Sequence, residues 1–135
     1  MKKVLVPGIL LSVVLLLFAF LCLWLMPIVL PKVAEEYYNP SFVNDPARNA
    51  WYYVQPVVLA FGLSWFWSRF KQVLTGNWFF QGLEMGLIYL VIATIPAMVL
   101  TFSAIDVSLQ VIGTWILYGF LQATLAGLIF ARLHW

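Results

Sequence analysis

The sequence predicts an all-α, polytopic integral membrane protein with four transmembrane helices in an antiparallel bundle. Of its 135 residues, 64% are hydrophobic and 9% are charged, a composition that would leave a soluble domain of this size without a wettable surface. Crossing a hydrocarbon core of roughly 30 Å takes about 20 apolar helical residues. Four runs are long enough, and they cover residues 4–30, 51–68, 78–102 and 107–131. Because these runs use most of the chain, we expect residues 1–135 to form a single transmembrane domain.

The first apolar run follows Lys2 and Lys3 directly, as the core of a cleavable secretory signal also would. The run from Val4 to Leu30 is longer than the roughly 7–15 residues of a signal core, and it lacks an A-x-A-like cleavage site. We therefore expect a retained helix. Cys22 is the single cysteine of the chain, which excludes an internal disulfide and a C-x-x-C redox pair.

The distribution of lysine and arginine predicts the orientation in the membrane. Cytoplasmic loops of membrane proteins carry an excess of these residues. With a cytoplasmic N-terminus, five of the seven cations lie inside and two outside; the inner five are Lys2, Lys3, Arg69, Lys71 and Arg132, and the outer two are Lys32 and Arg48. The sequence therefore predicts a multi-pass protein of the cell membrane with both termini in the cytoplasm.

The outer loop, residues 31–50, is the largest stretch outside the predicted spans. Its three prolines indicate successive turns, and residues 35–38 are expected to form one short interfacial helix. The later outer link is a tight turn, in which Ser103 or Asp106 is expected to cap the fourth helix. Short links predict that successive helices are neighbours in space.

Two rows of residues recur every four positions along the fourth predicted helix. The polar row consists of Gln110, Thr114, Tyr118 and Gln122, and the small-residue row of Gly119, Ala123, Gly127 and Ala131. Small residues at this spacing let membrane helices approach closely. The fourth helix is therefore expected to be a packing helix, whose small-residue row faces either its own bundle or another protein.

Further polar and helix-breaking residues lie in the second and third predicted helices. Gln55 lies just below the outer boundary of its helix, as Gln110 does, so a hydrogen bond between these two amides is expected. Pro96 removes a backbone N–H and frees the carbonyl of Ile92, which predicts a kink eased by Thr94.

Glu84 is a carboxylate within an apolar run, between Gly82 and Gly86. If Trp78 marks the inner interface, Glu84 lies six residues deeper, or about 9 Å at 1.5 Å per residue. An ion pair with Arg69 or Lys71 near the interface is the first interpretation. The alternatives are a contact with a partner subunit, which the two glycines would allow to approach, and a proton or cation site.

The sequence contains few of the residue groups that catalysis or cofactor binding requires. His134 is the single histidine, so no His pair or His/Cys cluster exists for a metal or for nucleophilic catalysis. No glycine-rich phosphate loop or basic nucleic-acid face is present. We expect no catalysis, no cofactor, no metal and no nucleic-acid partner.

The layout resembles that of small four-helix bacterial membrane proteins of unknown function. The residues that carry the resemblance are the lysine-led first helix, the Pro/Asn loop, the glycine-spaced "GLEMGL" and the glycine-rich "GFLQATLAGLIFARL". It implies a bacterial inner membrane location and transfers no site residue. Small multidrug exporters also have four helices and one membrane glutamate, but theirs lies in the first helix, where this chain has no acid.

Two functions remain open. The first is a non-catalytic accessory or scaffold subunit, with the lipid bilayer and other membrane protein subunits as partners. The second is a small transporter or a lipid- or small-molecule-binding protein, in which a homo-oligomer would use Glu84 and the polar row.

Overall fold

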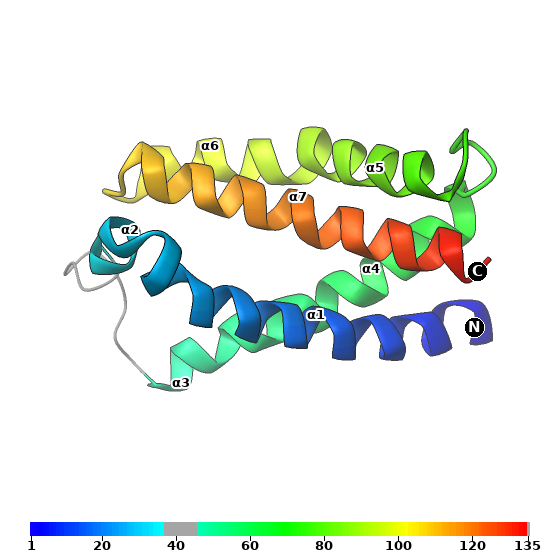
Figure 1. Ribbon diagram of the computed structural model, residues 1–135, viewed down its shortest axis with the longest axis horizontal. Helices are drawn as coiled ribbons and strands as arrows, with labels where there is room; N and C mark the ends of the chain where they lie inside the picture. Colours follow the sequence, from blue (N-terminus) through cyan, green and yellow to red (C-terminus); the bar gives the residue numbers. More distant parts are fainter. Residues whose placement is uncertain (37–45, 135) are drawn as a thin grey trace.

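The computed structural model describes residues 1–36 and 46–134, and every regular element in these ranges is helical (Figure 1). The long helices are α1 (Lys2–Val29), α4 (Val54–Phe70), α5 (Trp78–Tyr89), α6 (Ile95–Ala104) and α7 (Leu109–Arg132). The short ones are α2 (Pro31–Glu36), α3 (Pro46–Asn49) and the 3₁₀ turn η1 (Ala50–Tyr53). A π-helical turn, η2 (Leu90–Thr94), joins α5 to α6. The all-α prediction is confirmed for this part of the chain.

Among the residues that the structure describes, three helical stretches are long and apolar enough to cross a membrane. They are Lys2–Val29, Trp78–Ala104 and Leu109–Arg132, and they correspond to the first, third and fourth predicted spans. The helix of the second predicted span, α4, has 17 residues and follows the 3₁₀ turn. Its crossing of the membrane therefore stays a prediction.

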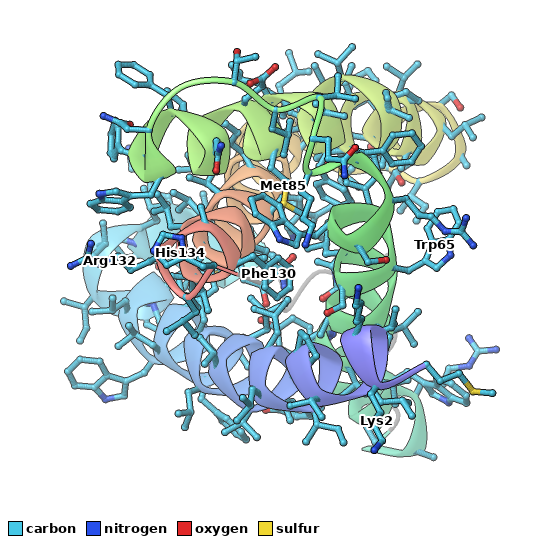
Figure 2. The ribbon with its side chains drawn as sticks, turned by 90° about the vertical axis from the view of Figure 1, so that its right-hand side faces the viewer. Lys2, Trp65, Met85, Phe130, Arg132 and His134 are labelled. Carbon is cyan, nitrogen blue, oxygen red and sulfur yellow. The ribbon has the colours of Figure 1, made fainter. Side chains whose placement is uncertain are left out.

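The long helices pack mainly in two pairs, α1 with α4 and α5 with α7 (Figure 1). Both chain ends lie at one end of the molecule, and α2 lies at the other end with the turn between α6 and α7. The main core joins the two pairs; its members include Leu11 and Leu15 of α1, Leu63 and Trp67 of α4, Met85 of α5 and Phe130 of α7. In the end-on view, Met85 and Phe130 point into the space between the helices, whereas Trp65 points away from it (Figure 2). A second cluster at the α2 end contains Val33, Val107, Val111 and Ile112.

Side-chain caps define the N-termini of two helices. Ser108 accepts a hydrogen bond from the Val111 amide (3.3 Å) at the start of α7, and Asn77 accepts one from the Phe80 amide (3.1 Å) at the start of α5. The expectation that Ser103 or Asp106 caps the fourth helix is therefore wrong. α6 continues through Ala104, and the Ser103 hydroxyl donates to the Leu100 carbonyl within that helix (2.7 Å).

The helix around Pro96 is distorted one turn before the proline. The Ile95 amide donates to the Leu90 carbonyl, five residues earlier, which is the π-helical pattern. Since Pro96 has no N–H to offer the Ile92 carbonyl, the ladder is interrupted here in any case. The helix is thus irregular here in the form of a π turn, and the kink that the sequence predicted stays a prediction.

The outer segment contains two short helices, α2 and α3. The expected interfacial helix corresponds in part to α2, which begins at Pro31 and ends at Glu36. The remaining residues predicted for that helix, 37–38, lie outside the described residues.

Candidate functional site

Glycines bring the backbones of α5 and α7 into close contact. A Cβ atom added to Gly127 would lie 2.8 Å from the Gly82 Cα, and one added to Gly82 would lie 2.6 Å from Leu128. Real Cβ atoms do not approach other atoms this closely, so the contact requires glycine on both helices. The two glycines that flank Glu84 in sequence therefore face α7 of the same chain, since Gly86 likewise packs against Thr124.

The rest of the small-residue row lies in the same interior. Ala123 is completely buried, and Ala131 belongs with it to the main core. Gly119 faces the π turn, where an added Cβ would lie 2.8 Å from the Thr94 hydroxyl oxygen. Gly119 and Gly127 of the row thus pack on η2 and α5 of the same chain, and Ala123 and Ala131 are buried in its main core.

A reciprocal pair of amide hydrogen bonds joins the two helix pairs. Gln55 of α4 donates to the Gln122 Oε1 (3.3 Å), and Gln122 donates back to the Gln55 Oε1 (3.1 Å). Gln122 has no exposed surface. The prediction that Gln55 pairs with Gln110 is therefore wrong. Gln110 is exposed near the start of α7, whereas Gln122 lies in the middle of that helix.

The other members of the polar row have separate surroundings. The Thr114 hydroxyl donates to the Val111 carbonyl of its own helix (2.7 Å). The Tyr118 ring stacks on Phe18 of α1, with 5.7 Å between ring centroids and 3° between planes. Gln110 and Thr114 also line a groove between α7 and the junction of α1 with α2. The polar row is therefore divided among internal bonding, ring stacking and this groove.

Glu84 binds the loop between α4 and α5. Its Oε2 accepts a hydrogen bond from the Thr75 amide (3.3 Å), and Gln81 donates from its side chain to the Leu74 carbonyl (3.5 Å) in the same loop. The guanidinium of Arg69, one of the two predicted ion-pair partners, lies 6.0 Å from the centre of the Trp65 ring. The structure thus gives the carboxylate a backbone partner in the loop, and the ion pair with Arg69 or Lys71 stays a prediction.

The loop that Glu84 contacts contains a residue with a glycine-specific conformation. Gly76 has φ +94°, in the region that residues with a Cβ rarely adopt. Leu74 of this loop is buried in the main core. The loop is therefore anchored by one apolar side chain and by two side-chain hydrogen bonds from α5.

Metal-ligating side chains are dispersed in the structure. In the ranges 1–36 and 46–134, no group of three His, Cys, Asp or Glu side chains could hold a metal ion. His134 is exposed just after the end of α7.

Several residues that cap the helices or link them to one another were not among those expected from the sequence. Ser108, Asn77 and the partnership of Gln122 with Gln55 were not predicted. A polar residue just before an apolar helix is the signal that identifies Ser108 and Asn77 as N-caps. The glutamine pair has no comparable local signal, because it depends on how far α4 is displaced along α7.

No protein-family model, no curated protein and no solved structure matches this chain. The resemblance to small bacterial membrane proteins therefore stays a prediction from the layout of the sequence.

Proposed function

We propose that this chain is a four-span integral membrane protein, with both termini in the cytoplasm, that serves as a non-catalytic accessory or scaffold subunit of a larger membrane complex. The observation that carries the proposal is that polar and small residues of this chain contact one another between its own helices. Gln122 bonds with Gln55, and Gly127 contacts Gly82, so these residues hold the chain's own helices together. A helical frame that is joined in this way is suited to supporting a neighbour in the membrane.

The helix α6 supplies a surface for such a neighbour. None of its residues is buried within the chain, and Val99 and Leu100 are 64% and 71% exposed. The opposite side of the molecule, at α1, also exposes apolar side chains such as Leu17. Because lipid covers exposed apolar helices equally well, a subunit role requires a partner that contacts one of these surfaces selectively.

The four-span arrangement is supported by the position of the chain ends. They lie at the same end of the molecule (Figure 1), as an even number of crossings requires. The cation count favours the cytoplasm for that end.

The competing proposal is a small oligomeric transporter that uses Glu84 and the polar row. A transporter concentrates polar groups at one site near the middle of the membrane. In this chain Glu84 accepts from a loop amide, while Thr114 bonds to its own helix. These contacts favour the subunit.

Extraction in mild detergent followed by native mass spectrometry tests the proposal. A photoreactive residue placed at Val99 in α6 is compared with one at Leu17 in α1, which is equally exposed. We expect a stoichiometric larger partner that cross-links from Val99 and not from Leu17. A self-contained homodimer whose melting temperature rises with an added small molecule would contradict the subunit and support the transporter.

A further inference from the structure

A groove of about 510 Å³ lies between α7 and the junction of α1 with α2. One wall is formed by residues around the break between these helices, including Val29 and Lys32, and the other by residues within 110–117 of α7. Gly113 lies on the α7 side, and a Cβ atom added there would meet nothing within 4 Å. The groove is therefore open at Gly113, and a larger side chain at this position would narrow it.

The two ends of the groove differ in polarity along the axis of α7. Gln110, the second residue of that helix, lies near its N-terminus. Leu117 lies seven residues further along, or about 10 Å at 1.5 Å per residue. A ligand that fits both ends has a polar head and an apolar tail.

The polar end carries hydrogen-bond donors and one positive charge. Lys32 and Gln110 both line the groove; an ammonium group donates three hydrogen bonds and a side-chain amide donates two. Glu35, on the same short helix as Lys32, is exposed and is not among the lining residues. The head group that matches this end is an anion that accepts hydrogen bonds.

We propose that this groove binds one anionic phospholipid, with its phosphate at Lys32 and Gln110 and one acyl chain passing Gly113 toward Leu117. The groove lies at the α2 end of the molecule, where α1 and α6 end and α7 begins. The ends of membrane-spanning helices lie near the lipid head groups. A phospholipid with an uncharged head-group alcohol fits better than a zwitterionic one, because the described lining offers no acid to an amine. The inference is independent of the subunit proposal, since it concerns a lipid held by the chain itself.

Native mass spectrometry with added phosphatidylglycerol tests the site. Phosphatidylethanolamine and diacylglycerol with the same acyl chains are the comparison lipids, and inorganic phosphate is the comparison ion. We expect one equivalent of phosphatidylglycerol to bind, with about tenfold weaker binding when Lys32→Ala removes the charge-assisted hydrogen bond. Lys32→Arg should restore most of the affinity.

Matched variants distinguish specific binding in the groove from nonspecific attraction of an anionic lipid to a positively charged protein. Gly113→Leu should weaken binding of phosphatidylglycerol about as much as Lys32→Ala does. Gly62→Leu is its control, because Gly62 of α4 also has open space and lies outside the groove; Lys3→Ala is the control for Lys32→Ala. Both controls should bind as the parent protein does, and all variants should melt at nearly the same temperature.

Three results would overturn the proposal. Equal losses in Lys3→Ala and Lys32→Ala would mean attraction by net charge. Unchanged binding in Gly113→Leu would place the acyl chain elsewhere. Displacement of the lipid by millimolar inorganic phosphate would identify a simple anion site.

Discussion

Gln122 shows how one side chain connects the two halves of this protein. It is completely buried on α7, and both of its recorded hydrogen bonds go to Gln55 on α4. In a membrane, an amide without a partner is costly, but a bond between amides gains little over the alternatives that an unfolded chain finds in lipid. The pair therefore contributes more to the relative placement of α4 and α7 than to the free energy of unfolding.

Replacing Gln122 with leucine should lower the free energy of unfolding by about 1 kcal/mol. A double-mutant cycle with Gln55→Leu, measured by unfolding in detergent micelles, should give a coupling energy of about 0.5–1.5 kcal/mol. Gln110→Leu is the control and should change stability by less than about 0.5 kcal/mol. A coupling energy near zero would mean that the two amides act independently.

Glu84 should act through its hydrogen bond to the loop and not through its charge. Glu84→Gln retains a carbonyl oxygen that accepts from the Thr75 amide, so folding and assembly should be nearly unchanged. Glu84→Leu loses the bond, and the loop amides should then exchange with deuterium several-fold faster, at a cost of about 1 kcal/mol. A pH-dependent activity that Glu84→Gln abolishes would instead establish a proton site.

Between helices, the contact of α5 with α7 depends on the absence of side chains. Gly82 and Gly127 face each other with no room for a Cβ atom at Gly127, and Gly86 accommodates Thr124. Apolar side chains gain nothing by leaving lipid for a protein interior of equal polarity, so close packing supplies the attraction. The nearby π turn places Thr94 against Gly119 and extends the same contact along α7.

The substitution Gly127→Leu should separate α7 from α5. The added side chain meets backbone atoms of Gly82, which cannot rotate away, and overpacking of this kind costs about 1–3 kcal/mol. Thermal unfolding and the yield of purified protein should both fall. Gly62→Leu is the control: its surroundings are open, so stability should be unchanged or slightly higher, because leucine favours helix over glycine. Equal stability of the two variants would contradict the interface.

For the molecule as a whole, the number of crossings decides the side on which each end lies. Four crossings place both termini on one side, whereas three would place them on opposite sides. The described helices include three that meet the length and hydropathy of a span, with α4 slightly shorter.

Reporter fusions distinguish these arrangements. A reporter fused after Trp135 should read as cytoplasmic, and one inserted near Asn44, a position outside the described residues, should read as external. An external reading after Trp135 together with a cytoplasmic N-terminus would mean that α4 does not cross. A cytoplasmic reading near Asn44 would overturn the orientation.

Helical content and affinity for lipid follow from the sequence because they are local properties. Composition and the length of apolar runs predict α1, α7 and the stretch from Trp78 to Ala104 without reference to any neighbour. Four-residue spacing likewise identifies which residues of α7 share a face, since the spacing of a helix is known in advance.

Tertiary structure decided what each face meets. Spacing along α7 does not specify which helix covers Gly127. Because Gln55 and Gln110 lie at similar depth in their helices, the sequence predicted that they pair, but the observed partner of Gln55 is Gln122. The partner of Gln55 depends on the crossing and the axial displacement of α4 against α7. The partner of Glu84 depends on the position of the loop between α4 and α5, whose Thr75 amide donates to the carboxylate. The crossing, the displacement and the position of the loop arise from packing between segments that are far apart in the chain. In that packing, the close approach of backbones at glycines and the pairing of buried amides must be satisfied at the same time.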